Sequence, residues 1–170
     1  MNSVIFSHGK ESGPNGTKIQ VLSRVAESNG FEVLSLDYTD CRNAGERVVR
    51  LFDTLSEKNS ADTVLVGSSM GGYVASVVAT AFPVKGLFVL CPALYLSTEE
   101  YEVQDYSPKS DHIEIVHGWE DEVVPFESSV RFGKQTNAVL NLVHDNHRLS
   151  NSHEFLAHRF DHFLKRIVHQ

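Results

Sequence analysis

The sequence has little cysteine, no excess of positive charge and no long hydrophobic run. Its two cysteines, Cys41 and Cys91, are too few for a disulfide framework and lack the spacing of metal ligands, which favours a reducing, cytoplasmic location. A net charge of −7 without a basic cluster argues against nucleic acid or an anionic membrane as a partner. No apolar run approaches the length of a transmembrane helix, and residues 1–6 are typical of a strand, not of a signal peptide.

What the chain of 170 residues does contain is a regular alternation of strand-like and helix-like segments. This pattern predicts a single α/β domain over residues 1–170, a three-layer αβα sandwich whose parallel sheet is covered by helices on both faces. Ligands bind such sheets at the carboxyl ends of the strands, so the loops there hold the candidate site. The predicted strands are 4–7, 32–36, 64–67, 86–91, 113–117 and 139–143, and the predicted helices are 16–29, 44–58, 69–82, 125–135 and 150–168.

A G-x-S-x-G motif, Gly-Ser-Ser-Met-Gly at residues 67–71, lies between a predicted strand and a predicted helix. A serine at such a junction sits on a sharp turn that projects its Oγ above the sheet and points the next backbone N–H into the same space. Ser69 is therefore the candidate nucleophile. The alternative interpretation is an ordinary glycine-rich turn in which the serine caps the helix.

A nucleophilic serine needs a general base, and the base needs an acid that orients it. The loop after the fifth predicted strand contains Asp121, the preferred acid, with Glu120 and Glu122 as rivals. An acidic helix N-terminus would explain the same carboxylates without catalysis. The loop after the last predicted strand contains His147, the preferred base, with His144 as its rival.

The first predicted strand runs into a glycine-rich loop, residues 7–16. Its glycines allow a turn that can direct the Lys10 N–H toward a developing oxyanion, with the Met70 N–H as the second donor. A phosphate-binding loop is the competing interpretation. Its spacing, G-x-x-x-x-G-K-[ST], is not matched here, since the lysine precedes most of the glycines.

Together these segments resemble the α/β-hydrolase superfamily, in particular its small, lid-poor bacterial members of esterase type. The resemblance extends over nearly the whole chain, and it selects Asp121 over its neighbours. It implies six mostly parallel strands in the order 2-1-3-4-5-6, without the N-terminal antiparallel strands of the superfamily. The matching motifs are the oxyanion loop at 8–10, the nucleophile elbow at 67–72, the acid loop His-Gly-x-x-Asp-x-x-Val-Pro at 117–125 and the histidine loop at 147–149.

The resemblance implies a serine hydrolase that cleaves a small-molecule carboxylic ester or thioester through an acyl-serine intermediate. Ser69, Asp121 and His147 would form the catalytic triad, and the backbone of Lys10 and Met70 the oxyanion hole. No metal or other cofactor is expected. The alternative from another class is a non-catalytic binding or interaction protein on the same fold. The sequence gives no indication of the oligomeric state.

The stretch from Pro92 to Asp111 is where lids are usually inserted in this superfamily, and its length allows only one short helix. We expect Tyr95, Leu96 and Tyr101 to line a shallow apolar pocket for the acyl group. Because such a pocket cannot enclose a long acyl chain, small acyl groups are expected to be preferred.

Overall fold

A computed structural model describes residues 1–168. Within these residues the chain forms a six-stranded sheet in the order β2-β1-β3-β4-β5-β6, and every pairing of neighbouring strands is parallel. The predicted fold class and strand order are thereby confirmed. The strands are β1 Ser3–Ser7, β2 Glu32–Leu36, β3 Thr63–Ser68, β4 Gly86–Leu90, β5 Ile113–Gly118 and β6 Val139–Val143.

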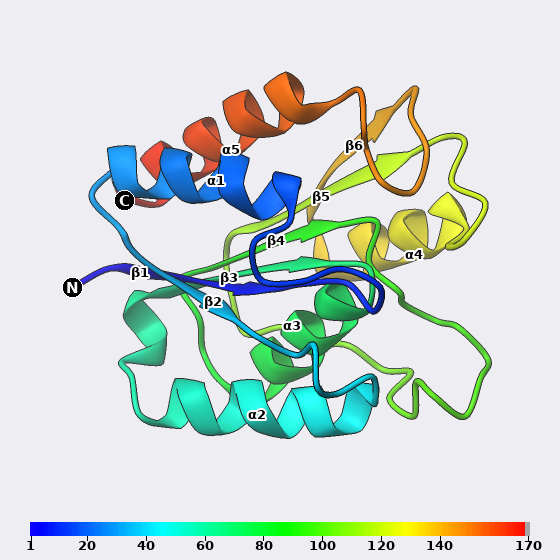
Figure 1. Ribbon diagram of the computed structural model, residues 1–170, viewed down its shortest axis with the longest axis horizontal. Helices are drawn as coiled ribbons and strands as arrows, with labels where there is room; N and C mark the ends of the chain where they lie inside the picture. The colour runs from blue at the N-terminus through cyan, green and yellow to red at the C-terminus, as the bar shows by residue number, and fades with distance from the viewer. Residues whose placement is uncertain (169–170) are drawn as a thin grey trace.

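Helices cover both faces of the sheet (Figure 1). One face carries α1 Thr17–Ser28 and α5 His153–Val168, which contact each other, and the other carries α2 Ala44–Ser56, α3 Met70–Ala81 and α4 Phe126–Thr136. A short 3-10 helix, Ser60–Asp62, precedes β3. In the described part of the chain, no helix is both long and apolar enough to cross a membrane.

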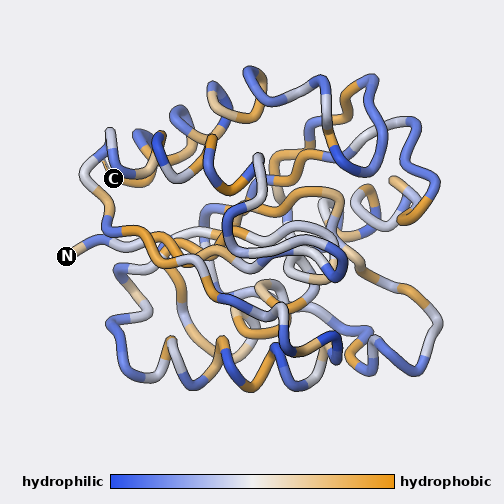
Figure 2. Tube along the Cα trace, in the orientation of Figure 1, coloured by the Kyte–Doolittle hydropathy of each residue, from blue (hydrophilic) through white to orange (hydrophobic). Residues whose placement is uncertain are grey.

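The hydrophobic residues form two clusters, one on each face of the sheet. In β1, Ile5 belongs to the cluster with α2 and α3, whereas Val4 and Phe6 belong to the cluster with α1 and α5. This alternation follows from the two-residue period of a strand. Figure 2 shows hydrophobic positions gathered along the central strands, while the outer helices alternate between hydrophilic and hydrophobic positions.

The predicted boundaries differ most at the start of α5, expected at residue 150 and found at His153. The cause is the Asp145 carboxylate, which accepts hydrogen bonds from the Asn151 N–H at 2.8 Å and from the Ser152 hydroxyl at 2.7 Å. These contacts hold the residues before α5 in a turn. The loop that contains His147 is therefore fixed at both ends.

The segment between β4 and β5, residues 91–112, contains no helix, although its length would allow a short one. Aromatic contacts fix it in an irregular path. The rings of Tyr101 and Tyr106 lie 5.0 and 6.2 Å from the ring of Tyr73 in α3, measured between centroids. The Tyr106 hydroxyl also donates to Val103 O at 2.7 Å. This segment therefore packs down against α3.

Two glycines allow α3 to begin close against the sheet. A Cβ on Gly71 would collide with the backbone carbonyl of Ser7 at the end of β1, and a Cβ on Gly67 would collide with the backbone of Gly71. Only residues without a side chain permit this approach. The close packing places the turn before α3 directly beside the loop after β1.

We expect Gly71→Ala to destabilise the protein by about 3 kcal/mol or more, because the added methyl meets backbone atoms that cannot move aside. Gly133→Ala is the matched control, since Gly133 is also buried in a helix but a Cβ there would lie 3.7 Å from Ile115 Cδ1, an ordinary contact. That variant should gain up to about 1 kcal/mol from helix propensity. Urea denaturation measures both variants, and equal stabilities would contradict the role of Gly71.

Candidate active site

Ser69 lies in the turn between β3 and α3 in a backbone conformation that few residues adopt. Its φ is 54° and its ψ is −117°, a conformation that persists only where surrounding contacts enforce it. Its N–H donates to Leu90 O at 3.0 Å, and its carbonyl accepts from the Ala93 N–H at 3.0 Å. The side chain is only partly buried, so the turn presents it at the carboxyl edge of the sheet.

His147, in the loop between β6 and α5, places its imidazole between Ser69 and Asp121. Its Nε2 lies 2.9 Å from Ser69 Oγ, and its Nδ1 lies 2.7 Å from Asp121 Oδ2. An ionised carboxylate can only accept, so Nδ1 carries the proton and Nε2 is left to accept from the serine hydroxyl. This geometry gives the serine a base and gives the base an orienting acid.

The buried carboxylate of Asp121 accepts four hydrogen bonds. Its Oδ1 accepts from the backbone N–H groups of Val123 and Val124, each at 2.8 Å, and its Oδ2 accepts from His147 and, at 2.9 Å, from His117 Nε2. Burial raises the pKa of Asp121, but the bonds from His117, His147 and the two backbone donors outweigh it and hold the pKa well below its usual range. The acid is therefore ionised at neutral pH.

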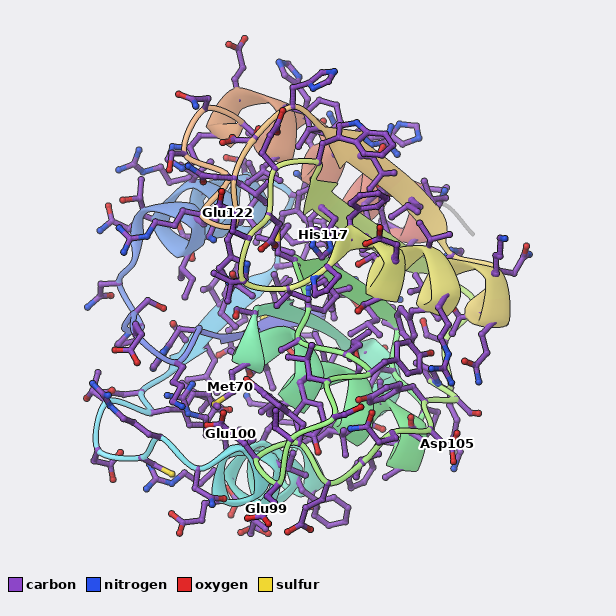
Figure 3. The ribbon with its side chains drawn as sticks, turned by 90° about the vertical axis from the view of Figure 1, so that its right-hand side faces the viewer. Met70, Glu99, Glu100, Asp105, His117 and Glu122 are labelled. Atoms are coloured by element: carbon purple, nitrogen blue, oxygen red, sulfur yellow. The ribbon has the colours of Figure 1, made fainter. Side chains whose placement is uncertain are left out.

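His117, the second histidine on this carboxylate, is fully buried at the end of β5 (Figure 3). Its Nε2 faces two acceptors, Asp121 Oδ2 and, at 3.0 Å, Val124 O, so Nε2 carries a proton. Its Nδ1 lies 2.7 Å from Ser129 Oγ in α4. The ring thus ties the acid loop to α4 and acts as a fixed donor to Asp121.

The rival side chains lie elsewhere. His144 is exposed and contacts Glu120 at 3.2 Å on the surface, so these two residues pair with each other. Glu122 is exposed as well. Of the acids and histidines considered from the sequence, Asp121 and His147 are the ones that the structure brings to Ser69.

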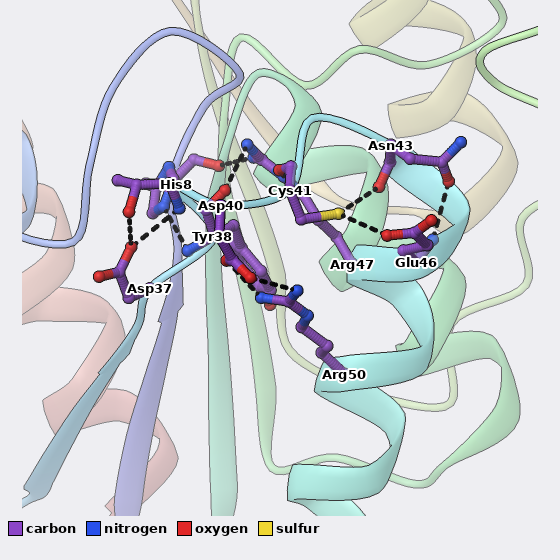
Figure 4. A network of polar contacts seen from close by, with 10 residues as sticks. His8, Asp37, Tyr38, Asp40, Cys41, Asn43, Glu46, Arg47 and Arg50 are labelled. Atoms are coloured by element: carbon purple, nitrogen blue, oxygen red, sulfur yellow. Dashed lines mark hydrogen bonds and ion pairs between the residues drawn. The ribbon is translucent and has the colours of Figure 1, made fainter.

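Arg47 of α2 holds the loop after β1 (Figure 4). A Cβ on Gly9 would lie 3.6 Å from Ser69 Cβ, so the loop and the serine are direct neighbours. The Nη1 of Arg47 donates to His8 O at 3.0 Å and to Gly9 O at 3.2 Å, and its Nε donates to Cys41 O at 2.8 Å. In the described residues, this fully buried guanidinium is bound by backbone carbonyls.

His8 donates to the same Gly9 carbonyl. Its Nε2 accepts from the Tyr38 N–H at 2.9 Å, so its Nδ1, 2.7 Å from Gly9 O, carries the proton. Burial lowers the pKa of His8 and outweighs the opposing effect of the carbonyl. The C=O and N–H of a trans peptide point in opposite directions, so fixing Gly9 O on this side directs the Lys10 N–H to the other side.

In the part of the chain that the structure describes, two backbone N–H groups next to Ser69, those of Lys10 and Met70, are free to donate a hydrogen bond. Within residues 1–168, neither the Lys10 N–H nor the Met70 N–H has a hydrogen-bond acceptor. Met70 is the first residue of α3, where the helix dipole adds to the attraction for an anion. The role of Lys10 and Met70 as an oxyanion hole stays a prediction.

A cleft of 830 Å³ opens in front of the serine, and Leu96 and Tyr101 form part of its wall. Tyr95 does not line it, contrary to the expectation from the sequence. The Tyr95 hydroxyl donates to Gln135 Oε1 at 2.7 Å, and the guanidinium of Arg131 lies 3.9 Å from its ring centroid. Both partners belong to α4, so these contacts hold Tyr95 away from the cleft.

Cys91 lies with His117 and Asp121 in a buried group whose potential ligand atoms are within 4.8 Å of one another. This group fits a metal ion poorly. Burial raises the pKa of the Cys91 thiol to about 12, and the His117 nitrogen that contacts Asp121 carries a proton. A metal would have to displace both protons and break the hydrogen bond between His117 and Asp121.

Two residues that support the site, His117 and Arg47, are not among those predicted from the sequence. For Arg47 a signal was present: it lies three residues after Ala44 and four before Leu51, on the buried face of α2. A charged side chain on such a face must find polar partners inside the protein. His117 stood in the acid-loop motif, but nothing local indicated that its ring contacts Asp121.

A comparison with protein families gives an independent assignment. The model of the uncharacterised protein family UPF0227 matches residues 3–106, which include the loop after β1 and the turn at Ser69. The chain belongs to this family. No curated protein sequence matches it.

Solved structures place the chain in the α/β-hydrolase superfamily. A Xanthomonas campestris protein assigned to the alpha/beta superfamily of hydrolases is 30% identical, with a TM-score of 0.86 over 98% of this chain and 99% of that one. Est1E from Butyrivibrio proteoclasticus, with ferulic acid bound, is 18% identical, with a TM-score of 0.81 over 100% and 90% of the two chains. The ydeN gene product of B. subtilis is 16% identical, with a TM-score of 0.83 over 100% of both. Membership of this superfamily supports hydrolysis as the activity.

The hydrogen bonds to Asp121 predict a pH-dependent contribution to stability. Its pKa is lower in the folded protein than the value of about 3.9 in an unfolded chain, so the contribution is complete above about pH 5 and is lost as the pH falls. We expect the free energy of unfolding to decrease below about pH 5 more steeply in the wild type than in Asp121→Asn, which cannot titrate at this position.

Urea denaturation over a series of pH values measures this difference. Asp53→Asn, on the exposed side of α2, is the matched control and should follow the wild type at every pH. If the free energy of unfolding changed with pH in the same way in the wild type and in Asp121→Asn, the contribution of Asp121 would be disproved.

Proposed function

We propose that this protein is a serine hydrolase that cleaves carboxylic esters or thioesters of small acyl groups. The observation that carries the proposal is the position of the His147 ring, hydrogen-bonded to Ser69 Oγ on one side and to Asp121 Oδ2 on the other. The same arrangement activates serine in hydrolases of unrelated folds. The strained turn at Ser69 supports it further, because such turns expose the nucleophile of α/β hydrolases.

In the proposed reaction, Ser69 Oγ attacks the substrate carbonyl while His147 Nε2 takes the serine proton. Asp121 holds the protonated Nδ1 in place and stabilises the imidazolium that forms. The tetrahedral intermediate then expels the alcohol or thiol, which receives the proton from His147, and the acyl group stays on Ser69. Water attacks the acyl-serine as His147 removes its proton, which gives a second tetrahedral intermediate. Its bond to Ser69 Oγ then breaks, Oγ takes the proton back from His147, and the carboxylic acid leaves.

We assign the developing oxyanion to the unpaired N–H groups of Lys10 and Met70. The bonds from Arg47 and His8 support this assignment, because they hold the Gly9–Lys10 peptide in one orientation before any substrate binds. Donors that are fixed in advance stabilise the transition state without reorganisation. The mechanism requires no metal or other cofactor.

A small acyl group suits the cleft. The segment between β4 and β5 packs against α3, and within residues 1–168 it forms no helix over the serine. Leu96 and Tyr101 offer apolar contact beside the reacting carbonyl. Est1E, which shares the fold, was solved with ferulic acid, a small molecule.

A fluorophosphonate probe tests the proposal, because it reacts with a serine that a base activates. We expect the wild type to be labelled on Ser69, and Ser69→Ala to lose both labelling and cleavage of 4-nitrophenyl acetate, with a decrease in kcat on the order of 10⁶-fold. Ser68→Ala is the matched control and should keep both.

Peptide mapping by mass spectrometry locates the adduct. An adduct on Ser68, or full activity in Ser69→Ala, would refute the assignment of the nucleophile. A wild-type protein that is neither labelled nor active would favour the non-catalytic binding protein instead.

A series of 4-nitrophenyl esters of increasing acyl length tests the size of the acyl group. We expect kcat/KM to be highest at about two to six carbons, since each methylene left in water forgoes about 0.8 kcal/mol of binding. Leu96→Ala should change this profile, whereas Tyr95→Ala, which alters a residue outside the cleft, should not. A steady increase toward long chains would show that the proposed size limit is wrong.

A further inference from the structure

Three cationic side chains line the cleft in front of Ser69, and one of them, Lys10, is paired with Glu100. Lys18, in the first turn of α1, and Arg148, which follows His147, both line it. Within residues 1–168, neither side chain forms an ion pair or a hydrogen bond. Their charged groups are therefore left for contact with a ligand.

The acidic residues in the same wall are already paired. Glu100 lies 2.6 Å from Lys10, and Glu11 lies 3.2 Å from Arg42. Among the described residues, the cationic side chains of the wall that remain without an ion pair are therefore Lys18 and Arg148, although the chain as a whole has a net charge of −7.

Lys18 and Arg148 lie close enough to affect each other. Burial lowers the pKa of Lys18, and Arg148 lowers it further, while Cys91, Asp121 and Asp145 oppose these effects. Two like charges in a partly dehydrated cleft repel each other, and a bound anion would relieve that repulsion.

Within residues 1–168, Lys18 forms no ion pair with the nearby carboxylates of Asp121 and Asp145, whose oxygens accept other hydrogen bonds. Asp121 accepts the four bonds described above. Asp145 accepts from the N–H groups of Asn146 and Asn151, each at 2.8 Å, and from Ser152 Oγ at 2.7 Å. Lys18 is thus free to bind a group that enters from the cleft.

We infer that the substrate of this cleft carries a carboxylate or phosphate group, which Lys18 and Arg148 bind while Ser69 attacks the ester carbonyl. This rests on the proposed hydrolase function and specifies its class of substrate. Leu96 and Tyr101 come from the segment between β4 and β5, whereas the cations come from α1 and the loop before α5. The cleft therefore offers one substrate both apolar side chains and two cations that have no ion pair in the described part of the chain.

Matched pairs of substrates test the inference, with the anionic group on either half of the ester. For the acyl half, the pair is mono-4-nitrophenyl adipate and 4-nitrophenyl methyl adipate. For the leaving group, it is 4-acetoxybenzoate and its methyl ester, with 4-acetoxyphenyl phosphate as the phosphate probe. We expect kcat/KM to favour the anionic member of at least one pair by about tenfold, and added salt to reduce that preference by screening.

Variants of the two cations identify the source of the preference. Lys18→Met and Arg148→Met should each reduce it several-fold, and the double variant should abolish it. Lys134→Met, on the exposed side of α4 and outside the cleft, is the matched control and should retain it. Lys18→Met should be at least as stable to urea as the wild type, whereas a lysine with a structural role would give a loss of stability.

Equal kcat/KM for the anionic and neutral members, unchanged in Lys18→Met, would overturn the inference and leave the hydrolase proposal intact. If no ester is cleaved, the hydrolase proposal fails but the anion site is not yet tested. Calorimetric titration with adipate and phenyl phosphate then measures whether Lys18 and Arg148 bind an anion. Binding to the wild type that disappears in the double variant would support the site, and no binding would overturn it.

Discussion

The carboxyl edge of the sheet depends on one close approach, that of α3 to the ends of β1 and β3. Gly67 and Gly71 permit it, since a side chain at either position would meet backbone atoms. The approach forces the chain through a sharp turn at Ser69, with a φ of 54°. It also brings the loop after β1 against the serine, and it leaves the first N–H of α3 facing the same space. The positions of Ser69 and of the Met70 N–H thus follow from a single packing constraint.

Arg47 provides the second constraint. A buried charge is costly unless it is well bonded, and its partners here are carbonyls of the loop after β1 and of the loop before α2. Burial of the Arg47 charge is therefore tolerated only while the loop beside Ser69 keeps the conformation that presents these carbonyls to it. Because these bonds fix a carbonyl, they also fix the direction of the N–H across the peptide. Arg47, which does not line the cleft, thus fixes the direction of the Lys10 N–H, one of the two proposed oxyanion donors.

Local pattern was sufficient for the elements and for the loops that meet at Ser69, whereas the family resemblance selected Asp121 over Glu120 and Glu122. Strand periodicity located the loops at the carboxyl edge, and Ser69, Asp121 and His147 each lie just beyond a strand, where a parallel sheet brings them together. The strand order came from the resemblance, because alternation of strands and helices alone fits several orders.

What the sequence could not predict arises from contacts between distant segments. The bond from Arg47 to His8 spans 39 positions, and nothing near either residue specifies it. The direction of Tyr95 depends on its contacts with α4, and the irregular path between β4 and β5 depends on tyrosines packed against α3. Periodicity contains no information about such pairs.

The arrangement of charges around the cleft is linked to the ionised state of Asp121. For Asp121 to orient His147, its carboxylate must be ionised, and hydrogen-bond donors keep it so without the direct contact of a cation. A lysine paired with this carboxylate would compete with His147 for it. Because Lys18 is excluded from that contact, its charge is available at the cleft. Over distances beyond the screening length of about 8 Å, charges elsewhere on the protein have little effect on a ligand in the cleft, so Lys18 and Arg148, together with the nearby carboxylates of Asp121 and Asp145, determine the field there.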